Sequence, residues 1–173
     1  ERASVTVPSS PVKSYTYTGS AISHGYTAPS GTSVVTSGTT ASATNVGTYN
    51  IVLAVDSNHK WSNGTTANKT VTWSITAKKL TKPTASGTYT YNGSGQTVSI
   101  ATNSGYTISG NTGANAGTYT AKVVLKDKAN TTWADGTTTD LSLSWKINAR
   151  SISSSEITIT VNPSSYAYTG SAI

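Results

Sequence analysis

The sequence predicts an all-β fold made of small antiparallel β-sandwich domains in tandem, with no helices of note. Three observations predict it: the residue types, a period-two alternation of apolar side chains, and an internal repeat. Thr, Val, Ile, Tyr and Trp fit a pleated, half-buried surface, and Ser and Thr alone supply more than a third of the chain. Only 10% of the residues are charged, so the Glu and Lys that long surface helices need are scarce.

The internal repeat is carried by four motifs that recur in the same order, about 75 residues apart. The Tyr-x-Tyr motif at residues 14–22 returns almost letter for letter at 165–173, with another copy at 88–94. The other motifs pair residues 45–49 with 115–119, 61–66 with 133–138, and 71–75 with 143–147. We therefore predict two complete repeats, 1–78 and 79–150, and the start of a third at 151–173. We expect Ile173 to cut that third repeat short within a longer array.

Two strands stand out in each repeat, because apolar and polar residues alternate there as in a strand with one buried face. The first strand of each repeat has one apolar face, formed by Tyr49, Ile51, Leu53 and Val55 and by Tyr119, Ala121, Val123 and Leu125. The second strand places Trp73 in phase with Ile75, and Trp145 in phase with Ile147. We predict that Trp73 and Trp145 lie in the core.

The dipeptides Asn63-Gly64 and Asp135-Gly136 predict tight turns. Both central positions of a type I′ turn need positive φ, which these residue types tolerate. We expect each dipeptide to form the tip of a hairpin between the two strands of its repeat.

The net charge of +6, with a pI near 9.5, raises the question of nucleic-acid binding, which would need basic residues gathered on one stripe. The twelve basic residues are scattered, and their one cluster is Lys78, Lys79 and Lys82. This cluster lies in residues 77–82, which we predict to link the first two repeats, with 149–155 as the corresponding linker after the second. The charge therefore predicts solubility and a mild attraction to anionic surfaces such as a cell wall or acidic glycans, and no nucleic-acid partner.

Several classes of protein are excluded by composition. No run of about 18 apolar residues is present, so we predict no membrane insertion in this segment. No secretory leader begins at Glu1, and we expect any export signal and anchor to lie outside this stretch. The absence of Cys removes disulfides, thiolate chemistry and Cys-based zinc sites.

The Asn-x-Gly-Thr-Tyr motif makes the fold prediction more specific. In immunoglobulin-like sandwiches, a tyrosine at the start of the penultimate strand folds its hydroxyl back onto the backbone before that strand, after a corner. Tyr49 and Tyr119 stand where such a corner would place them. The structural markers of the predicted immunoglobulin-like repeat are Tyr49, Tyr119, Gly47, Gly117, Trp73 and Trp145.

The order of these motifs resembles the bacterial immunoglobulin-like repeats of large cell-surface proteins and adhesins. The resemblance is carried by Tyr-Thr-Tyr-Asn-Gly, Asn-Ala-Gly-Thr-Tyr-Thr, Trp-x-Asp-Gly-Thr-Thr and Trp-x-Ile, followed by a basic step, and it covers both full repeats. It implies tandem sandwiches that serve as a stalk or as display modules outside the cell, at the surface or in the cell wall. It also implies neighbouring repeats of the same chain as partners, and it carries over no catalytic residues.

The residues that could carry chemistry do not form a recognisable site. His24 and His59 occupy unrelated positions and show no metal-binding spacing, so we interpret both as surface histidines. Asp56 and Asp127 end matching strands, which predicts a turn hydrogen bond. The acids are not clustered as a calcium site requires. We predict no enzyme activity, no metal and no cofactor.

Two alternatives stay open. Trp61 and Trp133 lie at the base of the predicted hairpins, where they would either stack on a sugar ring or pack across the strands, and their recurrence in both repeats favours packing. If these tryptophans or the loop at residues 24–30 bind a ligand, the protein is a binding module for glycans or host proteins. A phage virion decoration domain of the same fold is a further alternative.

An intramolecular Lys–Asn or Thr–Gln cross-link, as some bacterial stalk domains carry, is a minor alternative. Either bond would need its residues on adjacent strands with an acid nearby, and ideally in both repeats. Gln96 has no equivalent in the first repeat, and Asn148 corresponds to Thr76.

Overall fold

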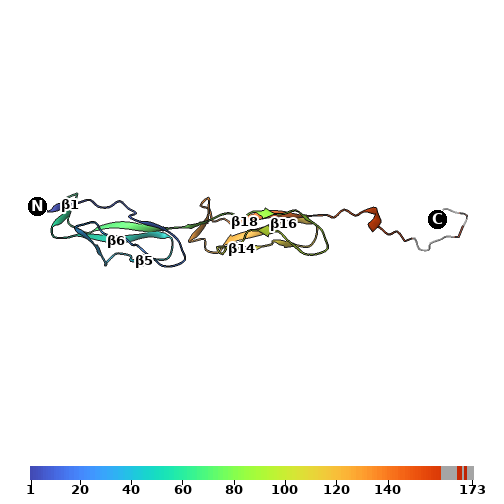
Figure 1. The fold of residues 1–173 in the computed structure, drawn as a ribbon, viewed down its shortest axis with the longest axis horizontal. Coiled ribbons are helices and arrows are strands. Elements are labelled where there is room, and N and C mark those ends of the chain that lie inside the picture. The colour runs from blue at the N-terminus through green and yellow to red at the C-terminus, as the bar shows by residue number, and fades with distance from the viewer. Residues whose placement is uncertain (161–166, 169, 171–173) are drawn as a thin grey trace.

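The computed structural model describes residues 1–160, 167, 168 and 170 of the chain, and the all-β prediction is confirmed for them. Apart from strands, the described residues contain one short 3₁₀ helix, η1 (Ser154–Glu156). None of their helices is long and apolar enough to cross a membrane. Figure 1 shows two β-rich bodies that follow one another along the long axis of the molecule. Most of the predicted third copy of the Tyr-x-Tyr motif, at residues 165–173, lies outside the described residues.

The strands divide between the two repeats. In the first repeat they are β1 (Ala3–Val5), β2 (Ser14–Thr16), β3 (Ile22–Ser23), β4 (Thr32–Val35), β5 (Ser42–Ala43), β6 (Gly47–Val55), β7 (His59–Trp61) and β8 (Lys69–Thr76). In the second they are β9 (Lys78–Leu80), β10 (Ala85–Ser86), β11 (Tyr89–Thr90), β12 (Gln96–Thr97), β13 (Ser99–Ile100), β14 (Tyr106–Ser109), β15 (Thr112–Gly113), β16 (Gly117–Leu125), β17 (Thr131–Trp133) and β18 (Leu141–Asn148).

Both repeats contain the same four-stranded sheet, with strand order β2-β8-β6-β4 in the first and β11-β18-β16-β14 in the second. The two long strands are antiparallel, and their register is also the same, because Tyr49 pairs with Trp73 and Tyr119 pairs with Trp145. The short strand at one edge, β2 or β11, runs parallel to its long neighbour. Strands β3 and β5, and their counterparts β12 and β15, form separate two-stranded ribbons.

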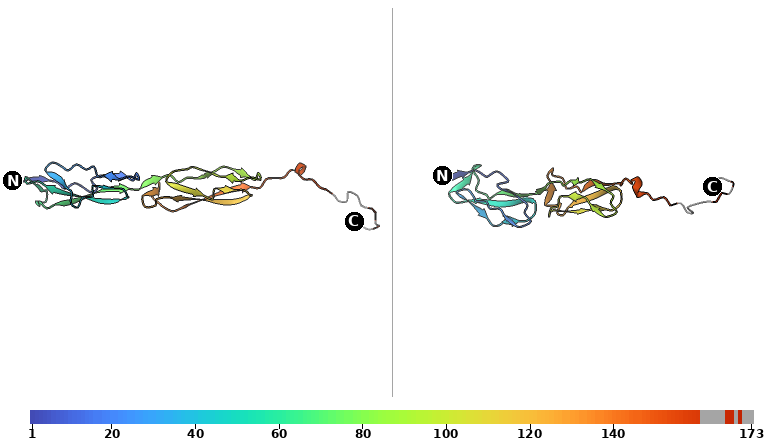
Figure 2. Two further views of the ribbon diagram at one scale, coloured as in Figure 1. Left: turned by 90° about the horizontal axis from the view of Figure 1, so that it is seen from below. Right: turned by 45° about the vertical axis from the view of Figure 1, so that its right-hand side comes forward.

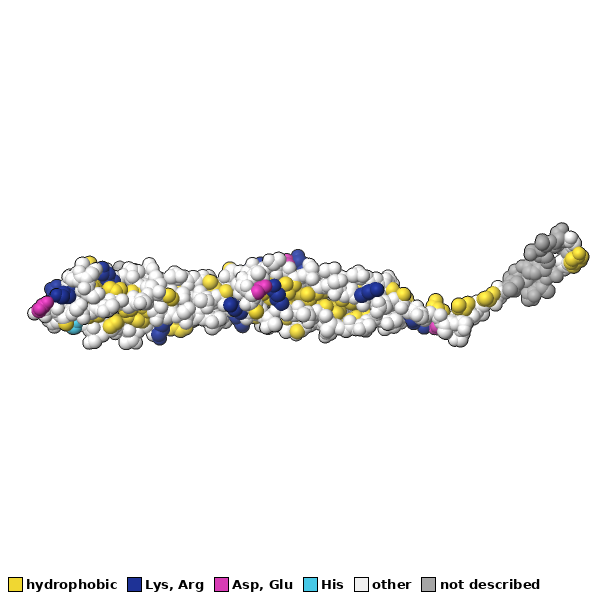
Figure 3. All heavy atoms as spheres, turned by 90° about the horizontal axis from the view of Figure 1, so that it is seen from above, with side chains coloured by type: hydrophobic (Ala, Val, Ile, Leu, Met, Phe, Trp, Pro, Cys, Tyr) yellow, Lys and Arg dark blue, Asp and Glu magenta, His cyan; other side chains and the backbone are white. Residues whose placement is uncertain are grey.

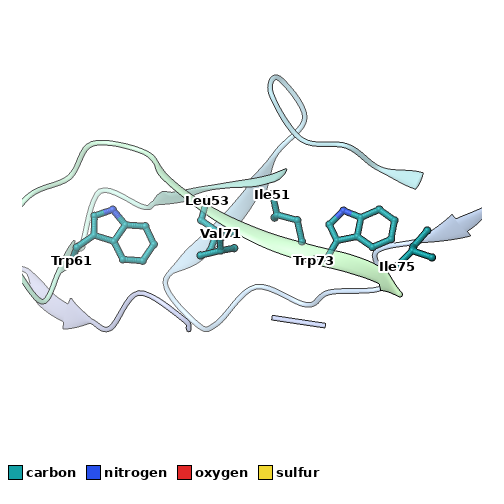
Figure 4. Close-up of a cluster of buried hydrophobic side chains, with 6 residues drawn as sticks. All are labelled: Ile51, Leu53, Trp61, Val71, Trp73 and Ile75. Carbon is teal, nitrogen blue, oxygen red and sulfur yellow. The ribbon is translucent and has the colours of Figure 1, made fainter. Parts of the chain in front are cut away.

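The buried side chains gather within each repeat. In the first repeat, Trp61, Leu53, Val71, Ile51, Trp73 and Ile75 form one row of side chains (Figure 4). The second repeat has two clusters, around Trp133 and around Trp145. The prediction that Trp73 and Trp145 are core residues is confirmed, since they are 0% and 6% exposed. Among the described residues, no core cluster combines side chains from both sides of Ala77.

The predicted linker at residues 77–82 is wrong. Residues 78–80 form β9, which pairs in parallel with β17 and places Leu80 opposite Trp133. Leu80 is buried because its side chain completes the core around Trp133, and β1 does the same for the first repeat by pairing with β7. Only Ala77 separates β8 from β9, and the second structural body begins at Lys78, one residue earlier than the predicted repeat boundary.

The predicted type I′ turns are also wrong. Gly64 has φ of 84°, but among the described residues no residue other than glycine has positive φ, so Asn63 does not. Gly64 N–H donates to Trp61 O, and Trp61 N–H donates to Thr65 O, both at 2.8 Å, which describes a type I turn closed by a glycine bulge. Asn63 Oδ1 favours this turn by accepting hydrogen bonds from Thr65.

The position of this turn also differs from the prediction. The turn follows β7, which pairs with β1 and not with the long strands β6 and β8. The turn therefore does not connect the two long strands directly. The second repeat has the same arrangement, because Gly136 N–H donates to Trp133 O and Trp133 N–H donates to Thr137 O.

Candidate functional site

The two predicted tyrosine corners have the hydrogen bond that defines them. Tyr49 Oη donates to the main-chain oxygen of Asn45 at 2.6 Å, and Tyr119 Oη donates to that of Asn115 at 2.7 Å. Each ring also packs on the core indole opposite, with ring centroids 4.9 Å apart for Tyr49 and Trp73 and 4.8 Å apart for Tyr119 and Trp145. The corner therefore holds the chain just before the first long strand against the core.

The two marker glycines are not equivalent. A Cβ on Gly47 would lie 3.0 Å from Tyr49 Oη, whereas a Cβ on Gly117 would meet nothing closer than Tyr119 at 4.0 Å. In the second repeat the tyrosine ring covers Gly113 instead, where a Cβ would lie 2.6 Å from Tyr119 Cζ. Sequence analysis missed Gly113 because Ala43 stands at this position in the first repeat.

We expect Tyr49→Phe and Tyr119→Phe each to lower the unfolding free energy of the affected repeat by about 0.5–1.5 kcal/mol, the usual net value of one hydrogen bond. The phenyl ring keeps the packing on the indole, so the loss isolates the hydroxyl. Urea denaturation followed by tryptophan fluorescence measures it. Unchanged midpoints in both variants would show that the corner does not stabilise the fold.

Trp61 and Trp133 are both 0% exposed. Trp61 Nε1 donates to Ala67 O and Trp133 Nε1 donates to Thr139 O, each at 2.8 Å. Because neither indole offers an exposed face to a sugar ring, the structure contradicts their assignment as ligand contacts. Packing was the favoured alternative, and their burial confirms it.

The two histidines are half-buried rather than fully on the surface. His24 Nδ1 accepts a hydrogen bond from Tyr26 N–H at 3.0 Å, and its ring lies 6.4 Å from that of Trp73. His59 Nδ1 lies 2.6 Å from Asp56 Oδ1, and this contact is the main reason why the pKa of Asp56 is lowered. Among the described residues, no group of three or more His, Cys, Asp or Glu side chains is placed to hold a metal ion.

The predicted turn hydrogen bonds of the two aspartates are confirmed. Asp56 Oδ1 accepts from Asn58 N–H at 2.9 Å. Asp127 Oδ1 accepts from Ala129 N–H and Asn130 N–H, at 3.2 and 3.1 Å. Each carboxylate therefore holds the loop that leads from a long strand to the short strand bearing the buried tryptophan.

An open groove of about 620 Å³ runs beside β9 in the second repeat. Its lining includes Lys79, Lys82, Asn103 and Tyr106. Lys82 Nζ lies 2.6 Å from Asp135 Oδ2, so part of its charge is already compensated. On the face seen in Figure 3, charged side chains are scattered along both bodies and form no continuous stripe.

We expect the contact between Lys82 and Asp135 to make the second repeat more sensitive to acid. The hydrogen bond from Lys82, followed by those from Thr137, lowers the pKa of Asp135 from 3.8 to about 2. Because the folded-state pKa lies below the unfolded one, this contribution to stability is present above pH 3.8 and is lost as the pH falls to about 2. We expect Asp135→Asn to reduce the acid sensitivity of the second repeat, measured as its melting temperature against pH. Asn63 occupies this position in the first repeat, which serves as the internal control.

The best-built polar cluster lies between the two repeats and centres on Asn130, which is 7% exposed. Its Oδ1 accepts from Val46 N–H of the first repeat at 2.7 Å. Its Nδ2 donates to Asn45 Oδ1 at 3.2 Å and to Asp127 Oδ2 at 2.9 Å. Lys78 N–H donates to the main-chain oxygen of Asn130 at 3.0 Å. The buried amide is thus hydrogen-bonded through both its oxygen and its nitrogen, to both repeats.

Tyr17 adds a second contact across this junction. The Asp127 carboxylate is the main cause that raises the pKa of Tyr17, and Tyr17 in turn contributes to lowering the pKa of Asp127. Asn45 also accepts the corner hydrogen bond of Tyr49, so the junction and the tyrosine corner share one loop. We define the junction as Tyr17, Asn45 and Val46 of the first repeat with Asp127 and Asn130 of the second.

Sequence analysis did not identify this junction. The available signal was that Asn58 and Asn130 stand at the same distance before Trp61 and Trp133. That coincidence shows a repeated position, but it does not show that one asparagine is buried against a neighbouring repeat and the other is not.

No protein-family model matches this sequence, and no curated protein is significantly similar to it.

Proposed function

We propose that this protein is a non-catalytic structural segment of a large extracellular bacterial surface protein or adhesin. In this proposal each repeat is an immunoglobulin-like β-sandwich domain that folds by itself, and the array acts as a stalk or display element. The recurrence of one strand order and of one tyrosine corner in both repeats supports the immunoglobulin-like assignment. The separate core clusters support two domains.

The observation that carries the stalk function is the way in which the repeats are joined. They follow one another along a single axis in each view of Figures 1 and 2. The connection between β8 and β9 is the single residue Ala77, and the junction hydrogen bonds bridge the two bodies. A short connection and a polar contact at the ends of elongated bodies favour an extended arrangement of the two repeats over a compact one.

Small-angle X-ray scattering tests this function. We expect the full chain to have an extended distance distribution with the same maximum in calcium and in a calcium chelator. A control in which Ala77 is replaced by a flexible Gly-Ser segment should sample shorter distances on average. A compact particle, or an extension that requires calcium, would contradict the proposal.

The second candidate function is binding of a glycan or host protein, and the groove beside β9 is the observation that favours it. The lysines and hydroxyl side chains around it suit an anionic glycan better than the buried tryptophans do. A glycan array tests this candidate. A hit that Lys79→Ala weakens, with the fold retained, would support binding, and silence across the array would favour the structural role.

A further inference from the structure

One half of the junction has a counterpart in the first repeat. Asn58 and Asn130 occupy the same structural position, since the main-chain oxygen of each accepts a hydrogen bond from the first strand of its repeat. The donors are Ala3 N–H at 2.9 Å and Lys78 N–H at 3.0 Å. Yet Asn58 is exposed while Asn130 is buried. Among the described residues, a neighbouring repeat packs against Asn130 and none packs against Asn58.

The other half exists at the far end of the second repeat. Tyr91 corresponds to Tyr17, because Tyr17 N–H donates to Thr76 O at the end of β8 and Tyr91 N–H donates to Asn148 O at the end of β18. The tyrosine corners likewise make Asn115 and Ala116 the counterparts of Asn45 and Val46.

These counterparts are more exposed than the residues in the junction. Tyr91 is 39% exposed, whereas Tyr17 is half-buried. Ala116 is exposed, whereas Val46 is half-buried. An open hollow of about 410 Å³ also lies against Tyr91, lined by Asn92, Gly93 and Arg150. The far end of the second repeat thus has counterparts of the junction residues, and no neighbouring repeat covers them within the part of the chain that the structure describes.

We propose that Tyr91, Asn115 and Ala116 form a docking surface for a further repeat of the same kind, which would insert an Asp–Asn loop like that of residues 127–130. By the pattern of the existing junction, the incoming asparagine accepts from Ala116 N–H and donates to Asn115 Oδ1. The inference goes beyond the stalk function, because an array with flexible junctions could also serve as a stalk.

The occupant is a repeat in the same chain rather than a separate molecule. The interface is of the head-to-tail kind, in which one surface of a unit meets a different surface of the next, so it repeats without closing. The observed junction consists of a few polar contacts, which bind weakly between separate molecules. Covalent linkage raises the effective concentration of the neighbour to the millimolar range, which makes such a contact effective.

The test uses the full chain with a second copy of residues 77–148 inserted after Asn148, so that the far end of the second repeat meets a known Asp–Asn loop. Hydrogen exchange measured by NMR is expected to slow at Ala116 N–H on the order of tenfold relative to the unmodified chain. Replacing the inserted copy of Asn130 by alanine should abolish this protection. Asn58→Ala, at the same position but exposed, is the matched control and should leave it unchanged.

Two results would overturn the proposal. One is a chain of three folded repeats in which Ala116 exchanges as fast as before and the inserted repeat tumbles independently. If scattering still shows an extended particle, the stalk function stands and only the docking inference fails. The other is protection of Ala116 in the unmodified chain that rises with protein concentration, because the surface would then bind a separate copy end to end.

Discussion

Replacing Trp73 by alanine is expected to unfold the first repeat and to leave the second folded. Trp73 is 0% exposed, its ring packs against Tyr15 and Tyr49, and its Nε1 donates to Thr40 O at 3.1 Å. Truncating such a residue costs about 3–5 kcal/mol, which is much of the stability of a small domain. Because the core of the first repeat shares no cluster with that of the second among the residues that the structure describes, the loss should stay local.

Two-dimensional NMR spectra measure this outcome residue by residue. In Trp73→Ala we expect the amide signals of residues 1–76 to collapse or to melt early, while those of β16 and β18 keep their native positions. Trp145→Ala is the matched variant and should give the reverse pattern. A single cooperative loss of both repeats in either variant would contradict the division into two domains.

The second large effect is expected for Asn130→Ala. This change deprives Val46 N–H, Asn45 Oδ1 and Asp127 Oδ2 of their partner at a site that is only partly buried, although Asn130 itself is 7% exposed. Each hydrogen bond lost at such a site costs about 0.5–1.5 kcal/mol. We therefore expect lower stability and, in addition, loss of the fixed orientation between the two repeats.

Chemical denaturation measures the first effect, and ¹⁵N relaxation measures the second through the rotational diffusion of each repeat. The exposed Asn58 provides the matched control, and Asn58→Ala should change stability by no more than about 0.5 kcal/mol. If Asn130→Ala behaves like Asn58→Ala in both measurements, the junction is an incidental contact and the repeats are coupled only through Ala77.

These two variants separate the roles of apolar and polar groups in the molecule. The apolar clusters stabilise each repeat on its own, since burial is non-directional and depends on the area removed from water. The junction instead consists of directional hydrogen bonds that fit one relative orientation of the repeats. A stalk needs both, because the first keeps each unit folded and the second sets the direction in which the next unit points.

The features that could be predicted from the sequence alone are those that depend on neighbouring residues or that recur along the chain. The alternation around Ile51 and Val71 predicted long strands with one buried face, and Tyr49 and Tyr119 predicted corners that the structure confirms. Trp73 and Trp145 were recognisable as core residues because they stand in phase with apolar neighbours on their own strands. An alternation of apolar and polar residues with a period of two indicates which face of a strand is buried. This inference does not require knowing which strand or sheet packs against that face.

Only the tertiary structure decided what depends on partners distant in the chain. Residues 78–80, which resemble a basic linker, become strand β9 because β17 offers it a backbone ladder and Trp133 offers Leu80 a core. That packing, and β1 in the first repeat, also buries the tryptophans that we considered as sugar contacts. Asn130 is buried while Asn58 is exposed, although each stands three residues before a buried tryptophan. The physical reason is that a residue is buried only when a second surface packs against it. The sequence pattern around the residue does not identify that second surface.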